Sequence, residues 1–253
     1  MWHRVAPALA RHFTVVLMDL RGYGYSGRPA ADLEHRNYSK REMAMDALAV
    51  MAHHGFERFQ VLAHDRGARV AHRLAADQAG AVERMLLLDI APTLAMYDRT
   101  SEAFARAYWH WFFLIQPPPL PEALIEADPV RYLRYVMGSR HAGLEVFDAQ
   151  ALAHYERCVS LPGTATGICE DYRASASIDL EHDRADVAAG HRLALPLRVL
   201  CGEHGVVRRC FDVEALWKER AGDVSVGSLP CGHYMAEEAP ALLLDEALNF
   251  FRH

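Results

Sequence analysis

Asp65 stands in the sequence Ala63-His64-Asp65-Arg66-Gly67, between a short apolar run and a helical pattern. A nucleophile can be held on such a strand-to-helix turn, with small residues two positions to either side, because bulk there would clash with the neighbouring strand and helix. A carboxylate can displace a leaving group from saturated carbon, and water then cleaves the resulting alkyl-enzyme ester. That chemistry suits alkyl halides or epoxides better than esters or amides. Aspartate is also a common helix N-cap, and this segment alone favours neither role.

Two arginines, Arg66 and Arg69, follow at a spacing that puts them on the same side of a first helical turn. Cations at a helix N-terminus oppose the helix dipole, so their placement is unfavourable unless an anion is held there. Together with the free N–H groups of the helix start, two guanidiniums suit a small carboxylate. The alternative interpretation is that both are ordinary surface arginines. The pattern indicates a small anionic substrate.

His233, in Pro230-Cys231-Gly232-His233-Tyr234, follows the last apolar run and precedes a C-terminal helical pattern. A histidine there can act as a general base that deprotonates the water attacking the ester. We predict that Asp89 orients it, because Asp89 ends another apolar run and catalytic groups collect at the carboxyl ends of strands in open α/β sheets. Glu203 and Asp212, near the penultimate strand, are the alternatives.

Short apolar runs alternate with helical patterns in both terminal parts of the chain. The runs predict strands at Phe13–Leu20, Phe59–Ala63, Arg84–Ile90, Leu197–Gly202 and Val224–Leu229. Helices are expected at Arg66–Ala76 and at about 240–251, and Ser39 with Glu42 fits a capping box at the start of another helix. Strand–helix alternation with short connections implies right-handed crossovers and a parallel sheet covered on both faces.

The middle of the chain, from about residue 93 to 190, has aromatic-rich and acidic segments with helical spacing and no convincing strand. The length of 253 residues suits one large domain, or a core with one sizeable insertion. We therefore predict an α/β fold whose core comprises residues 1–92 and 191–253. Residues 93–190 are predicted to form a helical cap inserted between sheet strands.

Composition excludes several classes of protein. The net charge is −6 and no stripe of lysine and arginine is present, which argues against nucleic acid as a partner. The five cysteines have no metal-ligand spacing, so we predict a reducing cytoplasm, no disulfide framework and a core position for Cys201. The sequence has neither an apolar run of membrane-spanning length nor a signal peptide pattern. We expect a cytoplasmic enzyme that needs no metal or cofactor.

Several motifs together resemble a known family. Asp19 to Ser26, the turn His64 to Gly67 and Gly232-His233 resemble the epoxide hydrolase and haloalkane dehalogenase branch of the α/β-hydrolases. More closely, a larger set resembles the fluoroacetate (haloacetate) dehalogenases: Asp65-Arg66-x-x-Arg69, Asp89, Tyr108-Trp109-His110-Trp111, Cys169-Glu170-Asp171-Tyr172-Arg173 and Cys231-Gly232-His233-Tyr234. The similarity runs over essentially the whole chain.

This resemblance implies an α/β-hydrolase fold and a role for each matching residue. It implies Asp65 as nucleophile, His233 as base, Asp89 as its acid, Arg66 and Arg69 as ligands of the substrate carboxylate, and His110, Trp111 and Tyr172 as ligands of the departing halide. Imidazole, indole and phenol each supply one donor toward the developing charge. Taken alone, the segment from Tyr108 to Phe113 is more typical of a packed cap helix. A homodimer through the cap is a further implication.

The resemblance also has a gap. The family has further strands and a loop with a His-Gly-x-Pro motif before the segment resembling Met1 to Pro7. That loop contributes one N–H of an oxyanion hole, and the other comes from the residue after the nucleophile, here Arg66. We therefore expect an unpaired sheet edge and impaired ester hydrolysis, and we interpret the gap as a truncated gene model or an upstream start.

Three functions compete at this stage. The first is hydrolysis of a 2-haloacetate, fluoroacetate above all, to a 2-hydroxy acid and halide through an ester on Asp65. The second is epoxide hydrolysis, which shares the nucleophile and base but needs cap phenols, of which Tyr172 could be one. Arg66 and Arg69 would have no purpose toward a neutral epoxide. The third is a non-catalytic binding protein of the same fold.

Overall fold

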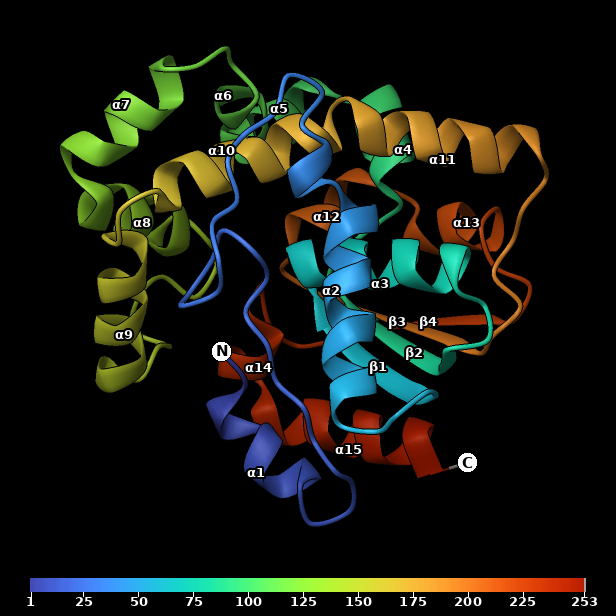
Figure 1. Ribbon diagram of the computed structural model, residues 1–253. Coiled ribbons are helices and arrows are strands. Elements are labelled where there is room, and N and C mark those ends of the chain that lie inside the picture. The colour runs from blue at the N-terminus through green and yellow to red at the C-terminus, as the bar shows by residue number, and fades with distance from the viewer. Residues whose placement is uncertain (253) are drawn as a thin grey trace.

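A four-stranded parallel sheet lies between helices in the computed structural model, which describes residues 1–252 (Figure 1). Its strands, in spatial order, are β1 (Phe59–His64), β2 (Val82–Leu88), β3 (Leu197–Gly202) and β4 (Val224–Leu229). All neighbouring pairs are parallel. The prediction of a parallel α/β sheet is therefore confirmed, and four of the five predicted strands end within two residues of their predicted bounds.

Apolar strands form because both faces of the sheet are covered. Leu87 of β2 packs with α2 (Lys40–His53) and α3 (Asp65–Asp77), whereas its neighbours Leu86 and Leu88 pack with α15 (Pro240–Arg252). All three leucines are fully buried. Successive side chains of a strand point to opposite faces, so a strand buried on both sides must be apolar throughout. Figure 1 shows α2 and α3 over one face of the sheet and α15 beneath the other.

The chain between β2 and β3 is helical. It forms α4 (Thr93–Asp98), α5 (Glu102–Ala107), α6 (Trp109–Leu114), α7 (Leu120–Ala127), α8 (Pro129–Gly138), α9 (Ala149–Val159), α10 (Thr164–Ser175) and α11 (Ile178–Ala188). Most of these helices form the upper part of the molecule in Figure 1. The division into a core of residues 1–92 and 191–253 and a cap of residues 93–190 stays a prediction.

The remaining helices of the described chain are short. They are η1 (Trp2–Arg4), α1 (Ala6–Leu9), η2 (Arg36–Tyr38), α12 (Val206–Cys210), α13 (Val213–Lys218) and α14 (Met235–Glu238). All five cysteines are free thiols, and Cys201 lies in the core as predicted. Within residues 1–252, no helix has both the length and the apolar character needed to cross a membrane.

The predicted strand at Phe13–Leu20 is wrong, because from Thr14 to Leu20 this segment has no regular structure. β-propensity becomes a strand only where a hydrogen-bonded partner lies alongside, and no ladder joins this segment to β1 within residues 1–252. β1 is instead an edge strand of the sheet. Leu17 consequently remains 57% exposed despite its apolar side chain.

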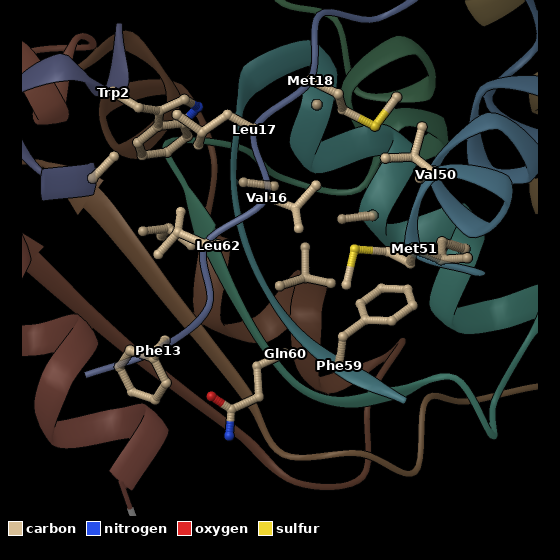
Figure 2. Close-up of a pocket in the computed structure, with 18 of the residues that line it drawn as sticks. Trp2, Phe13, Val16, Leu17, Met18, Val50, Met51, Phe59, Gln60 and Leu62 are labelled. Atoms are coloured by element: carbon tan, nitrogen blue, oxygen red, sulfur yellow. The ribbon is translucent and has the colours of Figure 1, made fainter. Parts of the chain in front are cut away.

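An apolar groove of about 590 Å³ lies between this segment and β1. Figure 2 shows side chains of the segment on one side of it, those of β1 opposite and those of α2 along it; the labelled ones include Val16, Met18, Met51, Phe59 and Leu62. The groove lies on the edge of the sheet, where an unpaired strand exposes main-chain N–H and C=O groups.

The predicted capping box at the start of α2 is half formed. Ser39 Oγ accepts a hydrogen bond from the main-chain N–H of Glu42 at 3.2 Å. The carboxylate of Glu42 makes no reciprocal bond to the N–H of Ser39, which donates instead to the carbonyl of Arg36. The serine alone therefore caps the helix.

The substitution Ser39→Ala should lower the free energy of unfolding by about 1 kcal/mol, because it leaves the N–H of Glu42 without its acceptor. Glu42→Ala should change it by less than about 0.5 kcal/mol. Urea denaturation followed by circular dichroism measures both. An equal loss in the two variants would show that the full capping box forms in solution.

Candidate active site

Asp65 occupies the turn between β1 and α3 in a left-handed conformation with φ of 45°. Aspartate tolerates this region better than most residues, yet the conformation still costs about 1–3 kcal/mol. The N-cap of α3 is His64, and the Asp65 carboxylate faces His233 instead of the helix N–H groups. The N-cap interpretation of Asp65 therefore does not hold, and the turn presents the carboxylate to the interior of the molecule.

The small residues around Asp65 differ in their surroundings. Ala63 is buried in the core, as expected for a position where bulk would clash. A Cβ atom added to Gly67 would meet nothing within 4 Å, because Gly67 lines the groove beside β1. The expectation that a larger residue at Gly67 would clash within residues 1–252 is thus wrong.

His233 joins two carboxylates that come from the ends of neighbouring strands. Its Nδ1 lies 2.7 Å from Oδ2 of Asp89, and its Nε2 lies 3.7 Å from Oδ2 of Asp65. Asp89 follows β2 with φ of 50°, and its Oδ1 accepts a hydrogen bond from the N–H of Gly202 at 3.1 Å. The Asp89 carboxylate is thereby fixed at Nδ1 of the imidazole, and the Asp65 carboxylate lies on the side of Nε2.

The alternative acids do not reach His233. Asp212 caps α13 by accepting a hydrogen bond from the N–H of Ala215. Glu203 accepts one from the hydroxyl of Ser228. The structure therefore brings together Asp65, His233 and Asp89, as the spacing at the strand ends predicts.

Electrostatics keep Asp65 ionised and make His233 more basic. Burial raises the pKa of Asp65, but His233, His64 and Arg69 outweigh it and hold that pKa well below its usual value. Burial lowers the pKa of His233, but the hydrogen bond to Asp89 and the charges of Asp65 and Asp89 raise it above the ordinary value. Such perturbed groups in contact are typical of catalytic sites.

His64 is a further residue of the site, and the sequence interpretation assigned it no role of its own. Its Nε2 lies 2.8 Å from the carbonyl oxygen of His233, to which it donates, and the two rings are 4.5 Å apart between centroids. Burial, then the charge of His233, lowers the pKa of His64 to about 4, so it stays neutral. Its position beside Asp65 in the sequence is the signal that could have found it.

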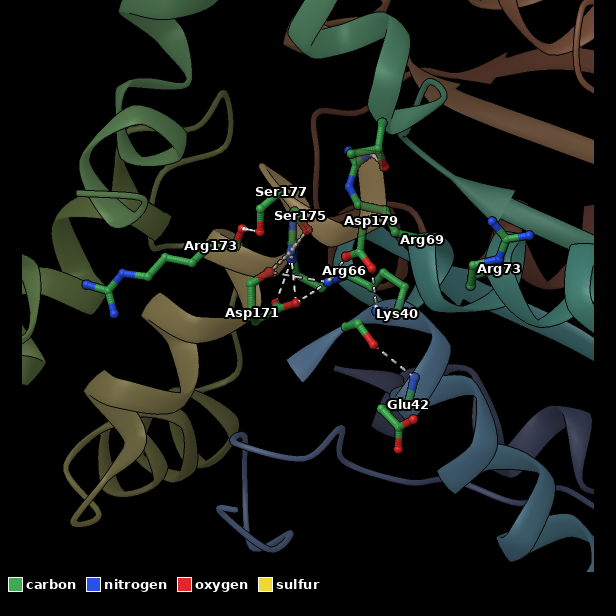
Figure 3. A network of polar contacts seen from close by, with 12 residues as sticks. Lys40, Glu42, Arg66, Arg69, Arg73, Asp171, Arg173, Ser175, Ser177 and Asp179 are labelled. Carbon is green, nitrogen blue, oxygen red and sulfur yellow. Dashed lines mark hydrogen bonds and ion pairs between the residues drawn. The ribbon is translucent and has the colours of Figure 1, made fainter. Parts of the chain in front are cut away.

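A buried carboxylate from the helices between β2 and β3, Asp171 of α10, holds three groups from the chain before β2 (Figure 3). It accepts from Arg66 Nε at 2.7 Å and Nη2 at 2.9 Å, and from the hydroxyl of Tyr23 at 2.6 Å. Lys40 forms an ion pair with it as well. Burial raises the pKa of Asp171, but the charges of Arg66 and Lys40 lower it more.

Arg66 and Arg69 are both buried, so the surface interpretation of these arginines is wrong. Asp171 occupies two nitrogens of Arg66, which means that the anion expected at the start of α3 is partly supplied by the protein itself. Nη1 of Arg66 is buried without a partner. Arg69 forms no ion pair within residues 1–252; its Nη1 donates to Thr93 Oγ1 at 2.9 Å, and its Nε has no partner.

Tyr172 and Trp111, from the helices between β2 and β3, stack on these arginines, and His110 lies beside Tyr172. We call these three residues the aromatic wall. The guanidinium carbon of Arg66 lies 4.0 Å from the ring centroid of Tyr172, and that of Arg69 lies 4.6 Å from the ring of Trp111. His110 lies 6.0 Å from Tyr172 between ring centroids. All three predicted halide ligands are thus buried together, and the indole Nε1 of Trp111 has no partner.

Two further residues join this wall without having been predicted. The hydroxyl of Tyr97 is buried and unpartnered, and its ring lies 5.1 Å from that of Trp111. Arg140 places a guanidinium nitrogen 3.4 Å from His110 Nε2. Arg140 lies between α8 and α9, and the sequence of this segment gives no signal that would predict a contact with His110. The arrangement sets an ionised carboxylate opposite several desolvated donors, which suits displacement at saturated carbon in an anionic substrate.

The substitution Asp171→Asn should lower the free energy of unfolding by about 3–5 kcal/mol, because it leaves Arg66 buried without a counter-charge, while Lys40 keeps only its ion pair with Asp179. The matched control is Glu156→Gln, which breaks the exposed pair with Arg134 and should cost less than about 1 kcal/mol. Chemical denaturation measures both. A loss of the same small size in Asp171→Asn would contradict the buried network.

Known proteins share this architecture. A family model described as "alpha/beta hydrolase fold" matches residues 1–135. The chain is 42% identical to the fluoroacetate dehalogenase of Burkholderia sp over 98% of its own length and 83% of that protein's. It is 34% identical to the soluble epoxide hydrolase of Corynebacterium sp. (strain C12), over 99% of its own length and 85% of that protein's.

A solved structure gives the same result. The crystal structure of ALR0039 from Nostoc sp PCC 7120 superposes with a TM-score of 0.97 at 53% identity, over 100% of this chain and 86% of that one. The match of a family model to more than half of the chain, and relatives above 30% identity over most of their length, agree with the sheet, the turn at Asp65 and the helices between β2 and β3. The chain therefore belongs to the α/β-hydrolase family and is a hydrolase similar to fluoroacetate dehalogenase.

Proposed function

We propose that this hydrolase removes halide from a 2-haloacetate, fluoroacetate above all, and releases a 2-hydroxy acid. The observation that carries the proposal is the set of buried donors without partners on Arg66, Arg69 and Trp111. Arg66 directly follows the ionised Asp65, the charge of Arg69 acts on it, and Trp111 stacks on Arg69. A buried donor that makes no hydrogen bond costs about 1–3 kcal/mol. A small anion with two acceptor groups, a carboxylate and a departing halide, would satisfy them.

The first step is displacement by Asp65. A carboxylate oxygen attacks the carbon that bears the halogen, the carbon–halogen bond breaks, and its electron pair leaves with the halide. The substrate carboxylate would be held by Nη1 of Arg66 and by Arg69, which also offset the repulsion between two anions. Donors of His110, Trp111 and Tyr172 would stabilise the charge that develops on the halogen. Fluoride, a poor leaving group, needs that stabilisation most.

The second step is hydrolysis of the ester. His233 takes a proton from water, and the hydroxide attacks the carboxyl carbon of Asp65. The bond from that carbon to the alkyl oxygen breaks, and that oxygen takes the proton back from His233, so the 2-hydroxy acid leaves. Asp65 keeps one oxygen from water and loses its carboxyl proton to solvent. Asp89 stabilises the imidazolium that forms, since its Oδ2 lies 2.7 Å from Nδ1 of His233.

Epoxide hydrolysis is the second candidate, and one observation favours it. Tyr97 has a buried hydroxyl without a partner, and Tyr172 is a second buried phenol on the same wall. Two phenols could protonate an epoxide oxygen. The unpartnered nitrogens of Arg66 and Arg69 would then remain unsatisfied, so a neutral epoxide explains fewer of the buried donors than a haloacetate does.

A single turnover with fluoroacetate in oxygen-18 water should place label in the peptide that contains Asp65. In His233→Ala the ester should accumulate, and that peptide should gain the mass of a carboxymethyl group. Asp65→Asn serves as the control without nucleophile. Release of fluoride with no label at Asp65 would contradict the covalent step. Diol formation from styrene oxide without fluoride release would favour epoxide hydrolysis, and binding of fluoroacetate without either product would indicate a non-catalytic protein.

The rate of fluoride release should fall at low pH, because His233 must be neutral to act as a base. Its pKa is raised by Asp65 and Asp89, so activity should be lost as the pH falls through a value above the ordinary 6.5. Asp89→Asn removes one of these charges and should move this acid limb to lower pH, while the maximal rate falls by about 100-fold or more. A pH–rate profile of both proteins tests this. An acid limb at the same pH in the variant would show that Asp89 does not act on His233.

A further inference from the structure

Arg140 carries a cation into the site from the segment between α8 and α9. Its guanidinium carbon lies 4.4 Å from the ring centroid of Tyr108, and its Nη2 lies 3.4 Å from Nε2 of His110. Its Nε is buried without a partner. No carboxylate within residues 1–252 lies at ion-pair distance from it, in contrast to Arg66 and to most arginines of the cap helices.

A guanidinium in this position is only partly compensated. Stacking on the ring of Tyr108 offsets part of its desolvation, but it leaves the charge without a counter-ion. Asp65 is the acidic side chain whose charge acts on Arg140. Tyr108, on which Arg140 stacks, lies 6.5 Å from His233 between ring centroids. An unpaired cation in this position is therefore available to an anion that arrives or forms in the site.

The contact with His110 also decides which nitrogen of that imidazole can donate. His110 is neutral, because burial and then the charge of Arg140 lower its pKa to about 3. A neutral imidazole has one N–H and one acceptor nitrogen. Arg140 has only donors, so Nε2 of His110 accepts from it and the proton of His110 stands on Nδ1.

We propose that Arg140 is a positioning residue that sets the leaving-group specificity of this hydrolase. It fixes the donor nitrogen of His110 and adds a positive charge on the side of the site toward which the halide departs. In an in-line displacement the negative charge moves from the attacking oxygen to the group opposite it, and Arg140 lies beside His110, one of the proposed halide donors. The inference rests on the proposed dehalogenation and adds Arg140 to the residues that act on the departing halide.

The variants Arg140→Met and Arg140→Lys test this role against Arg134→Met, which removes an exposed arginine of α8 paired with Glu156. Arg140→Met should lower kcat for fluoroacetate by about 10- to 100-fold, with KM changed by less than about 3-fold. For bromoacetate, whose leaving group needs less stabilisation, kcat should fall by less than about 3-fold. Arg140→Lys should recover part of the loss, and Arg134→Met should match the parent. An equal fall in kcat for the two substrates would overturn the inference.

Bromide titration keeps the test independent of turnover. Bromide quenches the fluorescence of tryptophan. The part of the quenching that is absent in Trp111→Phe comes from Trp111 and therefore measures bromide binding at the site. Arg140→Met should weaken bromide binding by about 10-fold, whereas Arg134→Met should leave it unchanged. Unchanged bromide affinity in Arg140→Met, with the unfolding temperature of the parent, would overturn the role of Arg140. If the parent protein binds bromide but does not release halide from any haloacetate, the proposed dehalogenation is refuted. The bromide affinity of Arg140→Met then still tests the role of Arg140.

Discussion

The buried carboxylate of Asp171 joins the helices between β2 and β3 to the helices that cover the sheet. It comes from α10 and holds Arg66 at the start of α3, Lys40 at the start of α2 and Tyr23 in the loop before it. Charges buried in this way must be paired, because an isolated charge in the interior costs several kcal/mol. Since Arg66 directly follows Asp65 in the chain, the ion pair also fixes the turn on which Asp65, the proposed nucleophile, stands.

Strain at two strand ends completes this positioning. Asp65 and Asp89 both have positive φ, at 45° and 50°, and each follows directly on one of two adjacent parallel strands. The neighbouring backbones bring the two turns to the same edge of the sheet, and His233 fills the space between their carboxylates. A conformation that costs about 1–3 kcal/mol persists only where the surroundings enforce it. The core beneath, with Leu86, Leu87 and Leu88 fully buried, supplies that enforcement.

The sequence predicts those parts of the site that depend on where strands end. Asp65, Asp89 and His233 could be identified because each stands just beyond an apolar run, and the carboxyl ends of parallel strands meet at one edge. The same reasoning was wrong for residues 13–20. An apolar run becomes a strand only beside a hydrogen-bonded partner strand, and the run itself carries no information about that partner. Asp171 was missed for a related reason. It lies in the motif Cys169 to Arg173, but its partners Lys40 and Arg66 are far from it in the chain.

Long-range pairing also changes what the two predicted arginines mean. Side by side on a helix, Arg66 and Arg69 look equivalent, and both seemed to require an external anion. The fold separates them. Arg66 is largely neutralised by Asp171, whereas Arg69 and Arg140 keep guanidiniums without carboxylate partners within residues 1–252. The unpaired positive charge therefore stands in two places, on Arg69 in α3 beside Trp111 and on Arg140 beside His110. A substrate that carries one fixed anion and releases a second would meet both.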